Sequence, residues 1–411
     1  MADQELPQRV SCIVAGGGPA GMMLGFLLAR AGVDVLVLEK HRDFLRDFRG
    51  DTIHPSTLQV MHELGLLDAF LRLPHQEVRE LHAIIGDSDV KIGDFSHLPT
   101  RCKFIALMPQ WDFLDFLAEH GRRLPAFHLG MEAEVTDLIE EGGRIAGVRG
   151  KTPQGPFKAR GALVIGADGR HSIVRERAGL VTKDIGAPID VLWMRLTRKS
   201  DDPGQTAGRI NYGRMLVMLD RGDYWQCAFV IRKGGYEGIR AGGLDAFRAD
   251  LLRLAPFLRD RLAELRDWDD VKLLTVAVDR LERWWRPGLL CIGDSAHAMS
   301  PIGGVGINLA IQDAVAAGNI LAQPLRDGTL TERHLAAVQQ RRTFPMRVIQ
   351  GMQVLVQERL LDRVLGDDKP LAAPWPMRLF NRIPFLARLP ARLVGIGPRP
   401  EHVRIAAAPV P

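Results

Sequence analysis

Residues 10–39 read VSCIVAGGGPAGMMLGFLLARAGVDVLVLE, and this stretch decides the fold. It holds an apolar strand, a glycine turn, an apolar helix and a second apolar strand, over residues 10–14, 15–21, 22–31 and 33–38. Gly16, Gly18 and Gly21 have the spacing GxGxxG, which places the turn at the start of the helix. The pattern predicts a βαβ unit.

The glycine turn indicates a site for a dinucleotide. Gly16 and Gly18 let the backbone turn tightly and approach a pyrophosphate, whose negative charge is stabilised at the N-terminus of the helix. Glu39 ends the second strand, where its carboxylate is placed for a hydroxyl of the adenosine ribose and disfavours a 2′-phosphate. Because NAD and FAD proteins both carry such a unit, it does not choose between the two.

The composition is that of an ordinary globular protein. The 411 residues are 46% hydrophobic and 25% charged, which suits two or three domains and excludes collagen-like, coiled-coil and wholly disordered chains. Charges of both signs alternate without a dense basic tract, so we expect no nucleic-acid partner. We also expect no transmembrane segment and no signal peptide. Four scattered cysteines predict neither disulfides nor a metal site, so a cytoplasmic protein is expected.

Two later segments repeat the pattern of an apolar strand that enters a polar turn. Residues 162–172 read ALVIGADGRHS, and residues 288–308 read GLLCIGDSAHAMSPIGGVGIN before an alanine-rich helix over 309–321, closed by Pro324. The dipole at the start of that helix favours a negative charge. Three glycines there, Gly303, Gly304 and Gly306, leave several backbone N–H groups uncovered by side chains.

Taken together and in this order, the three segments resemble the fingerprints of one protein family. GGGPAG with Glu39, GADGRHS, and GDSAHAMSPIGGVGINLAIQDA are similar to the fingerprints of the FAD-dependent aromatic monooxygenases of the para-hydroxybenzoate hydroxylase type, the single-component flavoprotein hydroxylases. The resemblance covers about residues 9–320. It implies an α/β fold, with a Rossmann-like FAD-binding domain, an inserted mixed β-sheet substrate domain and a C-terminal helical segment.

A change of sequence pattern sets the expected domain boundaries. Between about residues 182 and 271 the glycine fingerprints stop and alternating strands follow, with a hairpin expected over 215–231. The FAD-binding domain is expected to be discontinuous, over residues 1–80, 98–180 and 272–343. The substrate domain is expected over residues 81–97 and 181–271. A proline-broken segment with a helix at 344–364 is expected over residues 344–411.

The resemblance also implies which residues hold FAD. Glu39 lies at the adenosine ribose, the neighbouring Lys40 is a further cofactor-binding residue, and Arg49 and Gln110 bracket the diphosphate and the ribityl chain. The residues at the pyrophosphate are Gly16, Gly18, Pro19, Ala20 and Gly21.

Further implied contacts are made with the ribityl chain and the flavin ring. Asp294 holds a ribityl hydroxyl, Pro301 lies beside the isoalloxazine, and Asp168 belongs to a fingerprint that serves both FAD and NAD(P)H. Reduced flavin is an anion, and the helix N-terminus that follows Pro301 stabilises its charge. The residues at this pyrimidine end of the flavin are Gly303, Gly304, Gly306, Ile307 and Asn308.

In the resembling family the inserted sheet supplies the wall that faces the substrate. Trp193, Met215 and Trp225 are candidates for lining this pocket, and each also fits an ordinary sheet core. His54 is a candidate local base, and it also fits a turn residue before Pro55. The three tyrosines include no counterpart of the tyrosine relay that ionises a bound phenol. A larger phenolic, polycyclic or apolar aromatic substrate is therefore expected as readily as a benzoate.

The implied activity is hydroxylation by an FAD-dependent monooxygenase. NADH or NADPH reduces the flavin, O2 adds at the flavin C4a, and the distal oxygen of the hydroperoxide is transferred to an electron-rich aromatic ring. Arg195 and Arg214 are candidates for binding a substrate carboxylate. The alternative on the same scaffold is a flavin-dependent reductase of a prenyl or other lipid-like substrate. The WxWxIP motif of flavin halogenases is absent from the sequence.

The C-terminal tail interleaves apolar and basic side chains, namely Trp375, Met377, Arg378, Leu379, Phe380, Arg382, Phe385, Leu386, Arg388 and Arg392. Such a surface suits peripheral membrane contact or a lipid-like substrate. It also suits packing on the FAD-binding domain or on a second copy of the chain in a homodimer. Packing is the interpretation that we favour.

Overall fold

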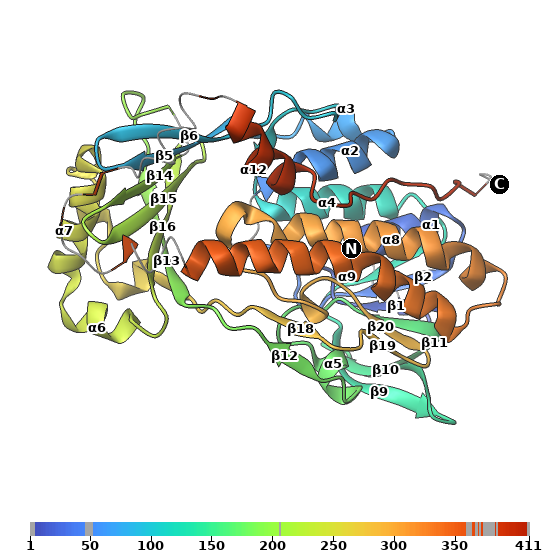
Figure 1. The fold of residues 1–411 in the computed structure, drawn as a ribbon. Helices are drawn as coiled ribbons and strands as arrows, with labels where there is room; N and C mark the ends of the chain where they lie inside the picture. Colours follow the sequence, from blue (N-terminus) through green and yellow to red (C-terminus); the bar gives the residue numbers. More distant parts are fainter. Residues whose placement is uncertain are drawn as a thin grey trace.

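The computed structural model describes residues 5–45, 52–204, 207–358, 364–365, 369, 371–372, 383 and 385–408. One β-sheet, with α6 and α7, lies at one end of the molecule, and a second sheet lies beneath long helices at the other end (Figure 1).

The larger sheet is built around the glycine turn. Its strand order is β19-β20-β11-β1-β2-β8, and β9 and β10 extend it along the first half of β11. β1 pairs in parallel with β2 and β11, and β11 pairs in parallel with β20, so these strands end at one edge. The bounds are β1 (Arg9–Ala15), β2 (Val35–Leu38), β8 (Phe127–Gly130), β9 (Glu134–Glu141), β10 (Arg144–Thr152), β11 (Gly155–Gly166), β19 (Trp285–Arg286) and β20 (Leu289–Cys291).

Long helices cover this sheet. α1 (Pro19–Arg30) packs against α4 (Gln110–Gly121) and α8 (Gly306–Arg326), and α8 packs against α9 (Glu332–Val356). Residues 20–29 of α1 are all buried, as its unbroken apolar sequence requires.

Two helices differ from the sequence-based expectation. The helix expected over 309–321 continues through Pro324 to Arg326, and the helix expected from residue 344 begins at Glu332 and continues through Pro345. Packing between the helices outweighs the hydrogen bond that each proline removes.

One described helical stretch, Ile302–Arg326, has the length and apolar composition of a membrane span. However, 78% of its most apolar part is buried inside the protein. A helix that is apolar on all sides is also what the core of a large protein requires.

The second sheet takes strands from two distant parts of the chain. Its order is β17-β13-β16-β15-β14-β5-β6, and its pairs are antiparallel apart from β14 and β5. α6 (Tyr236–Ala241) and α7 (Leu244–Leu254) pack on one of its faces. The strands are β5 (Glu80–Ile85), β6 (Ser88–Asp94), β13 (Ile189–Thr197), β14 (Ala207–Asn211), β15 (Arg214–Asp220), β16 (Tyr224–Arg232) and β17 (Lys272–Leu274). The predicted α/β class with an inserted mixed sheet is confirmed.

Smaller elements connect the two sheets. β3 (Thr52–Ile53), β7 (Ile105–Leu107) and β4 (Gln76–Val78) form a small sheet, and β12 (Thr182–Asp184) pairs with β18 (Asp279–Leu281). The short helices are α2 (Pro55–Glu63), α3 (Leu67–Phe70) and α5 (Ile173–Arg177), and the 3-10 turns are Pro256–Leu258, Leu262–Glu264, Trp268–Asp270, Gly293–Ser295 and Ile302–Gly304.

The end of the chain packs back onto the helices of the larger sheet. α12 (Phe385–Gly395) contacts β6, and the segment that follows lies along α8, where the Arg404 N–H donates to Asn319 Oδ1 at 2.9 Å (Figure 1). Residues 396–408 therefore favour the packing interpretation of the tail. The other predicted tail residues Trp375, Met377, Arg378, Leu379, Phe380 and Arg382 lie outside the described residues.

Candidate functional site

The three glycine segments meet at one edge of the larger sheet. Ala15, Gly166 and Cys291 are register partners at the carboxyl ends of β1, β11 and β20. The Ala167 N–H donates to the Ala15 carbonyl at 2.8 Å, and the Ile292 N–H donates to the Gly166 carbonyl at 2.9 Å. Ligands of open α/β sheets bind beyond the carboxyl ends of the strands, so the site predicted from three separate segments lies in one place.

Gly16 and Gly21 are required by close packing of the backbone. Gly16 has φ of +106°, and an added Cβ would lie 2.4 Å from the Ala167 carbonyl oxygen. At Gly21 an added Cβ would lie 1.9 Å from the Gly16 carbonyl oxygen. No larger residue fits at either position without moving the backbone.

Gly18 serves a different purpose. It is the N-cap of α1, no side chain caps the helix there, and an added Cβ would meet no atom within 4 Å. Pro19 and Ala20 then begin the helix. The turn therefore leaves open space in front of the N–H groups of α1, where the positive end of the helix dipole suits a pyrophosphate.

Glu39 connects the end of β2 to this turn. Its carboxylate accepts hydrogen bonds from the Gly17 N–H at 3.0 Å and from the His41 N–H at 3.1 Å, which fixes it beside the turn. The neighbouring Lys40 is exposed, and Gln110 is the half-buried first residue of α4. The predicted contact Arg49 lies outside the described residues.

Asp168 follows β11 and has partners within the protein. Its carboxylate accepts from the Ser172 hydroxyl at 2.5 Å and from the Val174 N–H at 3.1 Å, at the start of α5. Burial raises the pKa of Asp168 above its ordinary value. Asp168 thus caps a helix, and its contact with a cofactor stays a prediction.

Asp294 is carried by the turn Gly293–Ser295, directly beside the start of α1. Gly293 has φ of +61°, and an added Cβ there would lie 3.1 Å from the Cβ of Ala20. Asp294 itself is half-buried. The turn therefore lies close to the glycine turn, as the predicted ribityl contact requires.

The N-terminus of α8 is the second uncapped helix end at the site. No side chain caps it, and an added Cβ at Gly306 would meet no atom within 4 Å. Gly303 and Gly304 before it have φ of +79° and +62°, and an added Cβ at Gly304 would lie 2.4 Å from Thr52 Oγ1. Pro301 and Ile307 are half-buried on either side of these glycines.

The side chain of Asn308 is committed to the protein. Its Oδ1 accepts from the His54 N–H at 3.0 Å and from the Thr57 hydroxyl at 2.7 Å. Asn308 thereby connects α8 to the start of α2. Among the groups of Asn308, the backbone is the part that a flavin could contact.

The residues present fit FAD. Two uncapped helix N-termini, at Gly18 and Gly306, each adjoin space that an added Cβ would enter freely. FAD carries negative charge at its pyrophosphate, and its flavin becomes an anion when reduced, so both ends of the cofactor match a positive dipole end.

His54 is completely buried next to α12. Its Nδ1 lies 2.8 Å from the Val394 carbonyl oxygen, which can only accept, so Nδ1 carries the proton. Nε2 has no hydrogen-bond partner among the described residues. Burial lowers the pKa of His54 to about 4, which leaves Nε2 an unprotonated acceptor at neutral pH. The role of local base requires such an acceptor, and it stays a prediction.

The low pKa of His54 predicts a change of stability with pH. Between pH 6.5 and 4 the unfolded chain takes up a proton here that the folded protein does not, so stability falls as the pH falls through this range and is unaffected above it. The gap between the two values corresponds to about 3 kcal/mol. Urea unfolding at pH 7 and pH 4.5 is expected to show a smaller loss for His54→Gln than for the wild type.

The control for this prediction is His62→Gln, which changes an exposed histidine in α2, the helix that His54 precedes as its N-cap. Its loss of stability is expected to follow that of the wild type. Equal losses for the wild type and His54→Gln would contradict the prediction.

Trp193 and Met215 lie on the same face of the second sheet. Trp193 of β13 shares this face with Val191, and Met215 of β15 packs against the same buried cluster. Ile302, which follows Pro301, packs against that cluster as well. The structure therefore brings these two predicted pocket residues to the side of the sheet that meets the candidate flavin site.

Trp225 lies on the opposite face, and its assignment to the pocket is wrong. It is completely buried in the core that contains α7, and its Nε1 donates to Asp202 at 2.7 Å. β16 is buried on both faces along residues 225–231, so its sequence has no polar alternation that tells the two faces apart.

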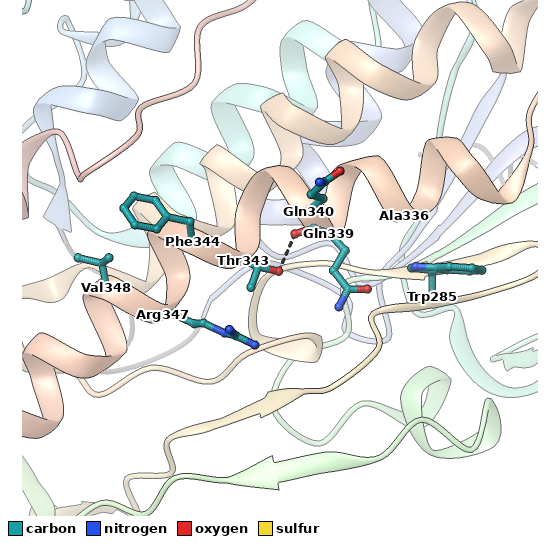
Figure 2. A pocket seen from close by; sticks show the side chains of 8 residues that line it. All are labelled: Trp285, Ala336, Gln339, Gln340, Thr343, Phe344, Arg347 and Val348. Atoms are coloured by element: carbon teal, nitrogen blue, oxygen red, sulfur yellow. Dashed lines mark hydrogen bonds between the residues drawn. The ribbon is translucent and has the colours of Figure 1, made fainter.

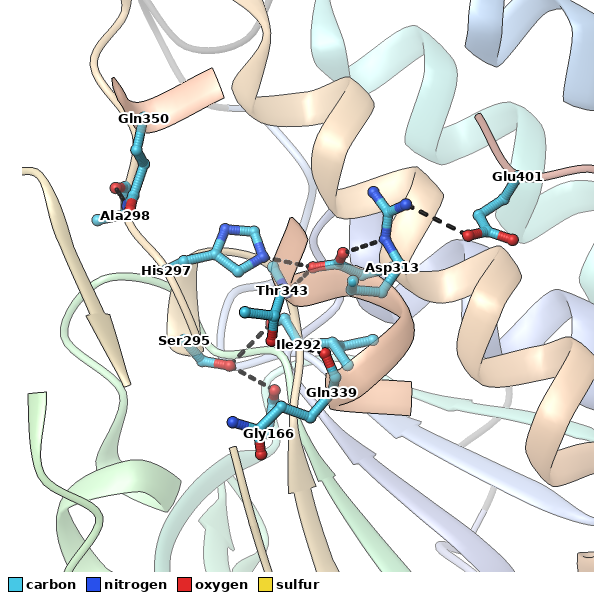
Figure 3. A network of polar contacts seen from close by, with 12 residues as sticks. Gly166, Ile292, Ser295, His297, Ala298, Asp313, Gln339, Thr343, Gln350 and Glu401 are labelled. Atoms are coloured by element: carbon cyan, nitrogen blue, oxygen red, sulfur yellow. Dashed lines mark hydrogen bonds and ion pairs between the residues drawn. The ribbon is translucent and has the colours of Figure 1, made fainter. Parts of the chain in front are cut away.

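A buried network supports the turn with Asp294 (Figure 3). Gly293, His297 and Asp313 lie within the third fingerprint, but no role was predicted for His297 or Asp313. Asp313 of α8 accepts hydrogen bonds from the Gly293 N–H at 3.0 Å, His297 Nε2 at 2.6 Å and Arg342 Nε at 2.9 Å. Burial alone would raise the pKa of Asp313, but His297 and Arg342 outweigh it and hold the pKa below its ordinary value. Two features of the sequence mark this residue: it lies near the end of the third fingerprint, and it is the one acid in the apolar run of α8.

A surface groove of about 610 Å³ lies along α9, apart from these residues (Figure 2). None of the residues predicted to hold FAD or substrate lines it. The lining residues are Trp285, Ala336, Gln339, Gln340, Thr343, Phe344, Arg347 and Val348. The groove is therefore not part of the candidate site.

Comparisons with known proteins agree with this site. The family model described as FAD binding domain matches residues 9–352. The 6-methylpretetramide 4-monooxygenase of Streptomyces rimosus is 34% identical over 366 residues, which cover 88% of this chain and 87% of that protein. The 12-dehydrotetracycline 5-monooxygenase/anhydrotetracycline 6-monooxygenase of the same species is 29% identical over 331 residues, which cover 75% of this chain and 62% of that longer protein.

A solved structure has the same fold. PqsL, a probable FAD-dependent monooxygenase from Pseudomonas aeruginosa, superposes with a TM-score of 0.75 at 23% identity, over 86% of this chain and 97% of that chain. The monooxygenase relatives do not favour the alternative of a lipid reductase. The family model matches most of this chain, which shows that the chain belongs to the FAD binding domain family. Within that family it is an FAD-dependent aromatic monooxygenase with NAD(P)H as co-substrate.

Proposed function

We propose that this enzyme hydroxylates a fused polycyclic phenol. The observation that carries the proposal is the 34% identity to 6-methylpretetramide 4-monooxygenase over 88% of the chain. A second relative is named for 12-dehydrotetracycline and anhydrotetracycline. Shared sequence over most of the chain supports a substrate of similar size and flatness.

The substrate face of the second sheet supports an apolar, flat ligand. Trp193, Met215 and Ile302 pack against a cluster of buried apolar side chains, among them Ile189, Val191, Ala228, Val230 and Val276. A wall of this kind gains free energy by covering the faces of an aromatic ring system.

The two arginines predicted as carboxylate binders are engaged elsewhere. Arg214 Nε lies 2.8 Å from a carboxylate oxygen of Asp250, and the guanidinium of the exposed Arg195 lies 4.9 Å from the centre of the Tyr224 ring. These contacts support an uncharged ring system over a benzoate.

In this proposal the residues of the chain bind, orient and shield the reactants. Gly18 and the N-terminus of α1 receive the pyrophosphate, Asp294 binds the ribityl chain, and the N-terminus of α8 at Gly306 stabilises negative charge at the pyrimidine end. Bound FAD supplies the redox chemistry, because it takes a hydride from NADH or NADPH and activates O2. The apolar face with Trp193 and Met215 orients the ring and excludes water.

The test is substrate-dependent oxidation of NADH and NADPH by the purified holoenzyme. Anhydrotetracycline, as a tetracyclic phenol, is expected to stimulate nucleotide oxidation and O2 uptake and to gain one oxygen atom. Para-hydroxybenzoate and a prenyl lipid are expected to do neither. Stimulation by para-hydroxybenzoate alone, or a product that forms equally without O2, would contradict the proposal.

Asp294→Ala is expected to weaken FAD binding by about 10- to 150-fold. A ribityl hydroxyl loses a charged acceptor, and a hydrogen bond to a charged group contributes about 1.5–3 kcal/mol. Fluorescence titration of the apoprotein with FAD measures the change. Asp87→Ala, in an exposed turn of the second sheet, is the control, and an unchanged FAD affinity in Asp294→Ala would remove Asp294 from the site.

The proposal also concerns the domain division, the cellular location and the oligomeric state of the protein. We propose that the division into an FAD-binding domain and a substrate domain follows the two large sheets. The cytoplasmic location is supported by the four cysteines, which are buried free thiols. A homodimer and a peripheral membrane contact stay predictions. Exposed apolar side chains that could take part in either contact are Phe344 of α9 and Phe385 and Leu389 of α12.

A further inference from the structure

Residues 298–302 connect two sides of the proposed site. Pro301 is the residue proposed beside the isoalloxazine, and Ile302 packs against the cluster that Trp193 contacts. The stretch contains no strand and no α-helix, and of its carbonyls the one of Pro301 is paired within the 3-10 turn that follows, by the Gly304 N–H at 3.0 Å. Buried backbone groups need partners, and the partners that they have here set the shape of the loop.

Three buried glutamines supply these partners. Gln350 and Gln353 lie in α9 and Gln357 caps its C-terminus, and the spacing i, i+3 and i+7 places them on one face. Gln350 is 1% exposed, and Gln353 and Gln357 are 0% exposed. Glutamine is mostly found at protein surfaces, so a buried row of three indicates a demand for hydrogen bonds.

Gln353 holds Ser300 much as a neighbouring strand would. Its Oε1 accepts from the Ser300 N–H at 3.2 Å, and its Nε2 donates to the Ser300 and Ile302 carbonyls, both at 2.9 Å. One side chain therefore satisfies three backbone groups of the loop.

Gln350 and Gln357 hold the loop on either side of Gln353. Gln350 Nε2 donates to the Ala298 carbonyl at 3.1 Å, a pair that Figure 3 shows, and Gln357 Nε2 donates to the Ser300 hydroxyl. The Ser300 hydroxyl also accepts from the Ile302 N–H at 3.3 Å. The row thus holds the loop from its first residue to its last.

We propose that Gln350, Gln353 and Gln357 are positioning residues for the hydroxylation. They fix residues 298–302, and through this loop they hold Pro301 and Ile302 where the flavin and the substrate ring meet. The inference rests on the proposed function, which assigns Pro301 to the flavin and Ile302 to the substrate side.

A loosened loop has a specific consequence in this reaction. Transfer of oxygen to the ring requires a dry site, because water that enters diverts the reaction. NAD(P)H, a proton and O2 then give NAD(P)+ and H2O2, and no oxygen atom enters the ring. The fraction of NAD(P)H that ends as H2O2 therefore reports the position of the loop.

The experiment compares Gln353→Met with Gln339→Met. Gln339 is a matched control on the same helix, because its Oε1 accepts from the Trp284 N–H at 3.1 Å and its Nε2 donates to the Glu282 carbonyl at 2.9 Å, away from the loop. Two quantities are measured: hydrogen exchange of the Ser300 amide in the FAD-free protein, and H2O2 formed per NAD(P)H in the holoenzyme with its substrate.

Gln353→Met is expected to speed exchange at Ser300 at least tenfold and to raise the H2O2 fraction at least twofold, and Gln339→Met is expected to change neither. Gln357→Met removes a single hydrogen bond, so it should give smaller changes in the same direction even where Gln353→Met does not fold. Wild-type exchange and coupling in the Gln353 and Gln357 variants would overturn the proposal, as would equal uncoupling in Gln339→Met. A wild-type protein that binds no FAD would instead refute the proposed function.

Discussion

Replacing Gly18 with valine is expected to remove FAD from the protein without unfolding it. An added Cβ at Gly18 meets no protein atom within 4 Å, and we expect the folded apoprotein to accommodate the whole valine side chain in this open space. The same space lies in front of the uncapped N-terminus of α1, where the pyrophosphate is proposed to bind. Loss of two hydrogen bonds to the charged phosphates, at about 1.5–3 kcal/mol each, corresponds to an affinity at least about 100-fold weaker.

Two glycine variants serve as controls for this experiment. Gly208→Val, in β14 of the second sheet, also enters open space and is expected to keep full FAD content. Gly16→Val forces its Cβ against the Ala167 carbonyl oxygen and is expected to lose the fold together with the flavin. Flavin absorbance of the purified proteins and circular dichroism separate the two outcomes. A folded Gly18→Val protein with full FAD content would show that this turn does not hold the pyrophosphate.

The contrast between Gly18 and Gly16 shows what a local motif can predict. The spacing GxGxxG indicates a tight turn at a helix start, and the structure has that turn between β1 and α1. The motif does not state which glycine is needed for the backbone and which for the ligand. That distinction depends on Ala167, which follows a strand far along the chain.

The sequence predicted that the inserted segment forms a sheet, but it did not predict which side chains lie on which face of that sheet. Alternation locates strands where one face is polar, as in β15 with its mixed burial. β16 is buried on both faces. Trp225 and Ala228 are therefore both apolar residues in an unbroken apolar run, and the sequence does not show that they lie on opposite faces, in different clusters. For a strand of this kind, only the elements packed above and below decide which residues face a ligand.

The groups that support the site were beyond sequence reasoning for a different reason. Asp313 and Arg342 come from two helices, and Ser300 and Gln353 from a loop and a helix, so no local pattern pairs them. A lone acid or glutamine in a helix has several neighbours that could satisfy it. The partner is set only when the helices pack, which is a tertiary property.

Asp313→Asn is expected to lower the free energy of unfolding by about 3–5 kcal/mol at neutral pH. Arg342 and His297 are each 1% exposed, and the change removes the carboxylate that both of them contact. Arg342 then keeps one buried carboxylate partner, Glu401, 3.3 Å from its Nη1. The pKa of Asp313 is held below its ordinary value of 3.8, so the contribution of this carboxylate is present above about pH 4 and is lost as the pH falls further. The difference between wild type and variant should shrink accordingly in acid.

The control is Glu134→Gln, because the carboxylate of Glu134 also lies 2.9 Å from a cation, Lys151 Nζ, but water reaches both side chains, which are 41% and 67% exposed. An exposed pair contributes about 0–1 kcal/mol, since water solvates both charges when the pair is broken. Urea unfolding of the three proteins at pH 7 therefore separates burial from ion pairing as the cause of the loss. Equally small losses of unfolding free energy in both variants would show that water reaches Arg342 and solvates the network around the turn with Asp294.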